Sequence, residues 1–119
     1  VIVRPHVPQL ALLERACLLI THAGMNSVNE GLYYNVPLLL VPQQLEQALV
    51  AQRVVDLGVG RKVRAERISA KSLRCLADQM LQDAALKANV QRVGASLRAS
   101  GGEVAAANAI EAFVKAGRR

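Results

Sequence analysis

A histidine, a glycine, small polar side chains and a carboxylate follow one another closely in the first third of the chain. They lie in the segment Thr21-His22-Ala23-Gly24-Met25-Asn26-Ser27-Val28-Asn29-Glu30-Gly31. The apolar run before it, residues 16–20, is typical of a strand buried on both faces. Where a strand turns into a helix, the first backbone N–H groups are unpaired and the helix dipole is positive. The segment therefore predicts a phosphate site at the start of a helix.

The spacing within this helix suits a nucleotide. Asn26 and Glu30 are four residues apart, and one helical turn rises about 5.4 Å, so their side chains stack on one face beside Ser27. The first turn would then bind a phosphate, and the carboxylate would accept hydrogen bonds from ribose hydroxyls. A second interpretation stays open, because Ser27 and Glu30 also match a capping box that only closes the helix start.

Two further polar positions have both a chemical and an ordinary interpretation. His22 could donate to a phosphate oxygen and stabilise a departing diphosphate, or it could be an incidental loop histidine. Glu46 and Gln47 follow the apolar run Leu38–Val41 and could bind sugar hydroxyls, or they could form the polar first turn of a helix. The aspartates stand alone, at 56, 78 and 83, so no Asp-x-Asp pair is available for a metal, and we expect none.

Composition limits the class of protein. The 119 residues are 52% hydrophobic and 20% charged, as in one globular domain. The chain begins inside a strand-like run without a Met, so we expect a piece of a longer polypeptide. No apolar run approaches the roughly 20 residues of a membrane span. Cys17 and Cys75 lie in apolar patterns, which predicts buried free thiols in a reducing compartment, the cytoplasm.

The formal net charge of +6 does not by itself indicate nucleic-acid binding. Stacking aromatic residues are few, namely Tyr33, Tyr34 and Phe113. The basic residues gather locally only at Arg61, Lys62, Arg64 and Arg67 and in the tail Arg118-Arg119. We interpret both groups as solvated surface, with attraction to anionic ligands or acidic lipid headgroups as the alternative.

Strand and helix patterns alternate over the first half of the chain. Strands are predicted at 1–3, 17–20, 38–41 and, at a sheet edge, 59–63; helices are predicted at 9–16, 24–34 and 45–57, with Asn35 left-handed after the second. Helical stripes continue from Ser69, from Leu86 and, beyond Gly101-Gly102, through Ala106, Ile110, Phe113 and Val114. This order predicts an α/β fold, a Rossmann-like parallel sheet flanked by helices. The loops 5–9, 21–24 and 42–47 would meet at the carboxyl ends of the strands, where such sheets bind ligands.

The same residues resemble the donor-binding signature of the UDP-glycosyltransferase superfamily, closest to its bacterial macrolide-type members. The similarity runs in order over residues 1–60 through Val7-Pro8-Gln9, Thr21–Ser27 with Glu30, Val36-Pro37, Pro42-Gln43, Glu46-Gln47 and Leu57-Gly58. It implies a GT-B architecture of two Rossmann-like domains, of which residues 1–119 are part of the C-terminal donor-binding domain, ending in C-terminal helices. The N-terminal acceptor domain would be absent.

The resemblance also implies roles for single residues. Gln9 would contact the ribose or base, Glu30 the ribose hydroxyls, and Glu46 with Gln47 the transferred sugar. The diphosphate would be held by four residues, His22, Gly24, Asn26 and Ser27. His6, before Val7, occupies a position where most relatives have an aromatic residue that stacks on uracil, so uridine specificity is less secure than diphosphate binding.

The expected function is metal-independent, inverting transfer of a hexose from a UDP- or dTDP-sugar to a hydroxyl of a small apolar acceptor, without a further cofactor. In this family the general base belongs to the N-terminal domain, so the fragment alone is expected to be inactive. Two alternatives remain, a non-catalytic nucleotide-sugar-binding or regulatory module and a lipid glycosyltransferase at the membrane surface.

Overall fold

The computed structural model describes residues 1–117, so the predicted Arg118-Arg119 surface lies outside the described residues. A parallel three-stranded sheet of order β1-β2-β3 forms the centre. Along the chain the elements are α1 (Gln9–Leu13), β1 (Leu19–Thr21), α2 (Met25–Tyr33), β2 (Leu38–Leu40), α3 (Leu45–Asp56), β3 (Gly60–Lys62), the 3-10 helix η1 (Ala65–Arg67), α4 (Ala70–Leu81), α5 (Ala84–Ala99) and α6 (Gly102–Gly117). This confirms the predicted α/β fold.

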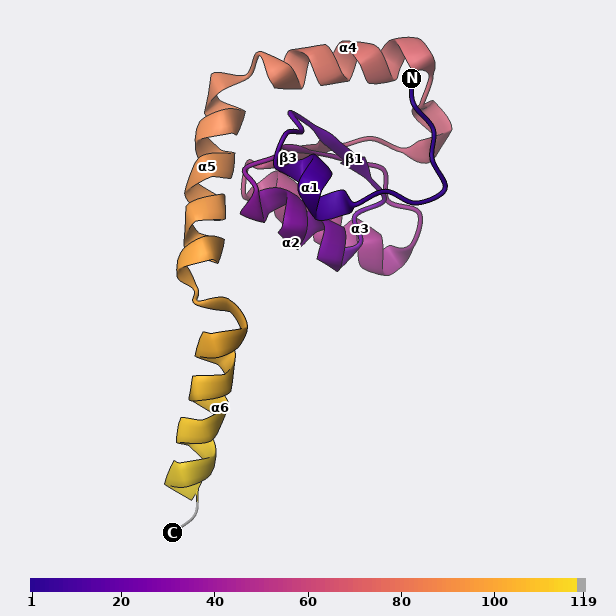
Figure 1. Cartoon of the computed structure of the whole chain (residues 1–119). Helices are drawn as coiled ribbons and strands as arrows, with labels where there is room; N and C mark the ends of the chain where they lie inside the picture. The colour runs from indigo at the N-terminus through magenta and orange to yellow at the C-terminus, as the bar shows by residue number, and fades with distance from the viewer. Residues whose placement is uncertain (118–119) are drawn as a thin grey trace.

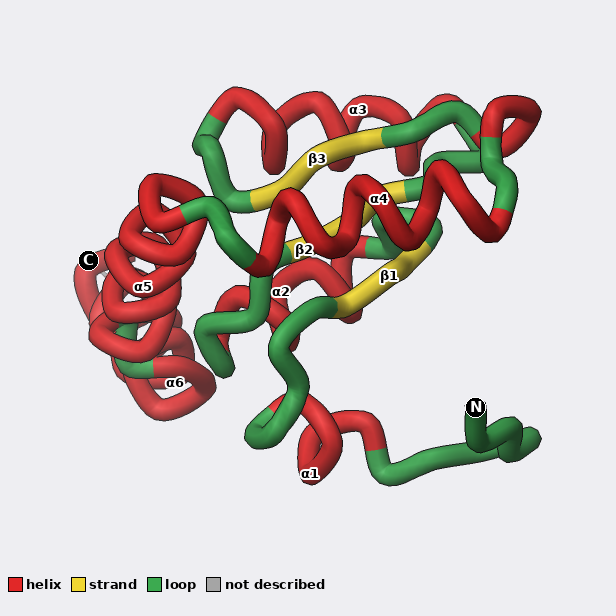
Figure 2. Tube along the Cα trace, turned by 90° about the horizontal axis from the view of Figure 1, so that it is seen from above, coloured by secondary structure: helices red, strands yellow, loops and turns green. Residues whose placement is uncertain are grey.

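The core is built around β2. Its three leucines are fully buried, and Leu38 pairs with Leu19 of β1 on one side and with Gly60 of β3 on the other. Helices α2 and α3 lie on one face of the sheet, while α4 crosses the other face and contributes the buried Met80 (Figures 1 and 2). The prediction that β2 is buried on both faces and β3 lies at an edge is confirmed.

The first two predicted strands differ from the structure. Residues 1–3 form no strand and are exposed, and β1 is an outermost strand with no other strand on its outer side among residues 1–117. At this open edge the run 17–20 is not buried on both faces, and Ile20 remains 47% exposed. The first helix is also shorter than predicted and ends at Leu13, the one buried residue in it.

The prediction of buried thiols is wrong, since Cys17 and Cys75 are both free and exposed. Cys17 lies ahead of the short β1, at the open edge of the sheet. Cys75 lies on the outer side of α4, whose inner side packs through Leu73, Leu76 and Met80. An apolar sequence pattern does not say which side of a helix a thiol occupies.

Helix α5 packs closely against α2. Asn35 ends α2 with a φ of 60°, as predicted, and Arg98 of α5 donates to its Oδ1 at 2.9 Å and to the Tyr33 carbonyl at 2.5 Å. A β-carbon at Gly94 would lie 2.3 Å from Asn35 Oδ1 and 2.5 Å from the Leu32 carbonyl oxygen, so only glycine fits at this crossing.

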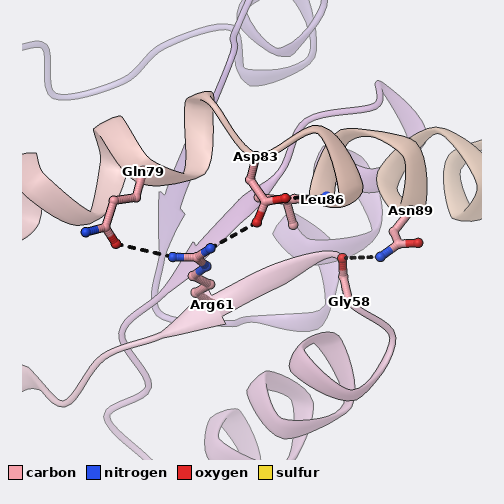
Figure 3. Close-up of polar contacts among 6 residues, drawn as sticks. All are labelled: Gly58, Arg61, Gln79, Asp83, Leu86 and Asn89. Atoms are coloured by element: carbon pink, nitrogen blue, oxygen red, sulfur yellow. Dashed lines mark hydrogen bonds and ion pairs between the residues drawn. The ribbon is translucent and has the colours of Figure 1, made fainter.

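Polar contacts at the turn between α4 and α5 join these helices to β3 (Figure 3). The guanidinium of Arg61 lies 2.9 Å from Asp83 and also donates to Gln79, while Asn89 donates to the Gly58 carbonyl. Asp83 caps α5 by accepting from Leu86 N at 3.0 Å. That backbone hydrogen bond, followed by Arg61, holds the pKa of Asp83 below its ordinary value. Ser69 caps α4, since its side chain accepts from Ser72 N at 3.0 Å.

Helix α6 extends away from the sheet beyond α5 (Figure 1). None of its residues is buried, and Ile110 and Phe113 are 64% and 81% exposed. Among residues 1–117 no helix is both long and apolar enough to cross a membrane.

Candidate functional site

A hydrogen-bonded cluster joins α1 to α2. The side-chain amide of Gln9, at the start of α1, donates to Glu30 Oε2 at 2.7 Å and lies 3.3 Å from Ser27 Oγ. All three side chains are half-buried. Three residues that the sequence assigns to one site are therefore in direct contact.

The start of α2 settles the capping-box question. Helix α2 begins after Gly24, and no side chain within residues 1–117 caps its start. Ser27 and Glu30 lie in the first and second turns of the helix, and their side chains contact Gln9 instead. The first hydrogen bond inside the helix runs from Val28 N to the Gly24 carbonyl. The amides of residues 25–27 thus have no partner within the helix, which leaves the positive helix end open to an anion.

The backbone is strained where β1 leads into α2. Ala23 is fully buried and has a φ of 76°, a left-handed conformation that is costly for a residue with a β-carbon. This turn places the His22 imidazole over Gly24, since a β-carbon at position 24 would lie 2.9 Å from His22 Nε2. The histidine and the open helix start therefore lie side by side.

These groups border a cavity of about 420 Å³ at the carboxyl ends of β1 and β2, which we call the rim cavity. Its lining residues are Gln9, Leu19, Ile20, Thr21, His22, Ser27, Val41 and Gln43. The prediction that three loops meet at one edge of the sheet is confirmed for Gln9, His22 and Gln43. Thr21, Val41 and Gln43 were not assigned as site residues, although their positions at strand ends are the signal that finds them.

The other predicted site residues are not among the residues that line the rim cavity. Asn26 is exposed in the first turn of α2, and Glu46 is exposed in the first turn of α3. Gln47 uses its Oε1 to accept from the backbone N of Gln43 at 2.9 Å and of Gln44 at 3.2 Å, which supports the helix start. Its amide nitrogen has no such bond within residues 1–117.

His6 and Val7 are exposed and precede α1 in a segment without regular structure. They precede Gln9 of the cluster along the chain. The His6 side chain makes no hydrogen bond within residues 1–117.

The rim cavity, with Glu30 bonded to its lining residue Gln9, has the groups to bind sugar hydroxyls and an anion together. The Glu30 carboxylate and Ser27 hydroxyl can accept from hydroxyl groups, while His22 and the α2 amides can donate to anionic oxygens. No arginine or lysine lines the cavity. Among residues 1–117 no three His, Cys, Asp or Glu side chains gather as a metal site would require.

Comparison with known proteins identifies the family of the chain. Residues 1–112 match the family described as erythromycin biosynthesis protein CIII-like, C-terminal domain. The chain is 40% identical over 114 residues to the uncharacterized UDP-glucosyltransferase YojK of Bacillus subtilis, covering 96% of this chain and 28% of that protein. It is 38% identical to the oleandomycin glycosyltransferase of Streptomyces antibioticus, covering 92% of this chain and 26% of that protein.

Among solved structures, the calicheamicin glycosyltransferase CalG4 superposes with a TM-score of 0.93 at 30% identity, over 98% of this chain and 30% of that one. The chain therefore spans less than a third of the length of these relatives and matches their C-terminal portion. It belongs to the erythromycin biosynthesis protein CIII-like C-terminal domain family, the C-terminal domain of GT-B UDP-glycosyltransferases.

Proposed function

We propose that the rim cavity binds the nucleotide of a UDP- or dTDP-sugar, and that the protein containing this chain transfers the hexose to a hydroxyl of a small apolar acceptor. The observation that carries the proposal is the contact of Gln9 with Ser27 and Glu30 beside His22 and the open start of α2. A carboxylate one turn beyond an anion site matches the step from a phosphate to a ribose.

In this proposal each group of the rim has one role. The α2 amides, Gly24, Asn26, Ser27 and His22 hold the diphosphate, and Glu30 accepts from the ribose hydroxyls. Gln9, with His6 and Val7 before it, lies toward the base. Glu46 and the free amide nitrogen of Gln47 hold the transferred sugar.

The transfer step follows from this placement. A deprotonated acceptor oxygen bonds to the anomeric carbon as the bond from that carbon to the diphosphate oxygen breaks, and the nucleoside diphosphate leaves with the electron pair. The configuration inverts because attack and departure occur on opposite faces. His22 and the helix start stabilise the charge that develops on the leaving diphosphate. The base that deprotonates the acceptor belongs to the N-terminal domain in this proposal, and no metal takes part.

Calorimetric titration of the full-length protein with UDP, dTDP and uridine tests the nucleotide site. We expect one diphosphate to bind at least about tenfold more tightly than uridine, because the diphosphate makes the contacts at the helix start. Equal affinities for uridine and both diphosphates would contradict the proposal. Tight diphosphate binding without sugar transfer to any hydroxyl acceptor would instead support a non-catalytic binding module.

A variant tests the role of His22. His22→Ala should lower kcat by about 100-fold, within the range seen when one stabilising donor is removed from a developing charge. Lys71→Ala, an exposed change on α4, serves as the control and should leave kcat unchanged. Activity should also survive addition of EDTA, and its loss on chelation would contradict transfer without a metal.

A further inference from the structure

A second hollow lies beside the rim cavity and is not used by the proposed function. It has a volume of about 890 Å³ and lies where β2 and β3 end. Its wall includes Pro42, Ala48, Lys62, Val63, Arg64 and Arg67, and we call it the basic hollow. It contains most of the local basic cluster that the sequence shows.

One loop separates the basic hollow from the rim cavity. Val41 and Gln43 line the rim cavity, whereas Pro42 between them lines the basic hollow. At the other wall of the basic hollow, Val63 N donates a hydrogen bond to the Leu40 carbonyl at 2.9 Å, which holds the end of β3 against β2. A ligand lying across this loop would reach both spaces.

The basic hollow also adjoins the residues proposed to contact the sugar. Ala48, in its wall, directly follows Glu46 and Gln47 in the first turn of α3. Parallel strands place their carboxyl ends along one edge in sheet order. The diphosphate at the end of β1 is therefore followed by the sugar at the end of β2, and then by the basic hollow at the end of β3.

Among residues 1–117 no acidic side chain forms an ion pair with the cations that line the hollow. Among residues 1–117 the one ion pair joins Arg61 to Asp83, and Figure 3 shows Arg61 directed to Asp83 and Gln79. The side chains of Arg64 and Arg67 make no hydrogen bond within the same residues, and Lys62 donates to the neutral Gln52. Glu66 is the single acidic residue in the wall, beside three cations.

We propose that the basic hollow binds a carboxylate or phosphate group of a substrate whose diphosphate is held at the start of α2. The group is carried either by the transferred sugar or by the acceptor, since both would lie at this end of the rim. In the second case the acceptor is apolar apart from this one anionic group. The inference rests on the proposed function for the position of the diphosphate. Planar arginine side chains suit such groups because they donate two parallel hydrogen bonds to paired oxygens.

Paired donors and acceptors that differ by one charge test the inference in the full-length protein. One arm compares UDP-glucuronate with UDP-glucose, and the other compares 4-hydroxycinnamate with its methyl ester as acceptor. In one of the two comparisons the anionic compound should give a kcat/KM about tenfold higher than its neutral counterpart. This is the size expected for a charge-assisted hydrogen bond. The arm in which this happens identifies which substrate carries the anion.

The double variant Arg64→Gln/Arg67→Gln should abolish that preference and leave the affinity for UDP unchanged. Both side chains are exposed and make no hydrogen bond among residues 1–117, so the substitutions should preserve the fold, which circular dichroism checks. Arg74→Gln, an exposed arginine of α4 outside the hollow, is the matched control and should keep the preference.

Two results would overturn the inference. One is the absence of any anionic preference in both arms in the unmodified protein, and the other is a preference that Arg74→Gln reduces as much as the double variant does. Failure of the proposed function looks different, because the unmodified protein would then not distinguish UDP or dTDP from uridine.

Discussion

At the scale of residues, Gln9 connects the two ends of the proposed nucleotide site. Its amide is 2.7 Å from Glu30 and 3.3 Å from Ser27, so it fixes the carboxylate that would accept from a ribose. A glutamine that makes these bonds without a ligand has its donor hydrogens already engaged. Its effect on nucleotide binding should therefore be exerted through Glu30.

A double-mutant cycle measures this dependence. Gln9→Ala should weaken UDP binding about fivefold to tenfold, as expected for loss of one hydrogen bond to a charged group. Glu30→Ala should weaken it at least as much, and the double variant should resemble Glu30→Ala alone, because Gln9 then has nothing to orient. Titration calorimetry on the full-length protein provides the four affinities. Additive losses would show that Gln9 contacts the nucleotide directly.

At the scale of elements, α5 depends on the N-cap residue Asp83 at its start and on its crossing with α2. Asp83 accepts from Leu86 N and pairs with Arg61, so the folded state holds its carboxyl group ionised. Because the pKa is lowered on folding, this group stabilises the protein above its ordinary pKa of 3.8. The contribution is lost as the pH falls through the lower pKa of the folded state.

Asp83→Asn should therefore lower the melting temperature at pH 7, and the difference from the unmodified protein should shrink as the pH falls below 3.8. Thermal unfolding followed by circular dichroism from pH 7 to pH 3 measures both effects. Asp78→Asn, an exposed change on α4, is the control and should alter the melting temperature little. A difference that stays constant with pH would contradict the assignment.

Gly94→Ala should destabilise the crossing of α5 and α2. The added methyl group would lie 2.3 Å from Asn35 Oδ1 and 2.5 Å from the Leu32 carbonyl oxygen. Overpacking of this kind costs about 1–3 kcal/mol, which outweighs the helix propensity gained by replacing glycine. Urea unfolding measures the change. Gly117→Ala is the matched control, since nothing lies within 4 Å of its position, and an equal effect of both would refute steric overlap.

At the scale of the whole molecule, α6 lies apart from the core. Figure 1 shows α6 extending beyond α5, and the molecule measures 62 Å along its long axis. Ile110 and Phe113 of α6 are exposed to solvent. Apolar side chains grouped on an unpartnered helix promote association, but they add little to the stability of the sheet. The two properties should therefore respond separately to substitution.

Ile110→Ser/Phe113→Ser should reduce self-association of the 119-residue chain and leave its melting temperature within about 2 °C, since surface changes usually alter stability by less than about 0.5 kcal/mol. Light scattering against concentration and thermal unfolding measure the two quantities. Leu86→Ala is the contrasting variant, because Leu86 is 5% exposed and its truncation should cost about 2–5 kcal/mol. A large loss of stability in the double serine variant would contradict this separation.

The sequence by itself determined the order of most helices and strands, and which of them carry the polar residues of the proposed site. Helical and strand periods are local properties, so the buried β2, the edge strand β3 and the left-handed Asn35 were predicted correctly. The motif from Thr21 to Glu30, together with the other segments of the donor-binding signature, also indicated the family. The binding roles of all the predicted site residues stay predictions: His6, Val7, Gln9, His22, Gly24, Asn26, Ser27, Glu30, Glu46 and Gln47.

Only the tertiary structure decided which groups meet. Residues 1–3 and the run 17–20 have a buried-strand pattern, yet their burial depends on a neighbouring strand that residues 1–117 do not provide. The structure excludes the capping box because α2 begins after Gly24, and it brings Ser27 and Glu30 into contact with Gln9, which is 18 and 21 residues away along the chain. Such contacts follow from how α1 packs on α2, and local periodicity carries no information about side chains brought together from separate elements.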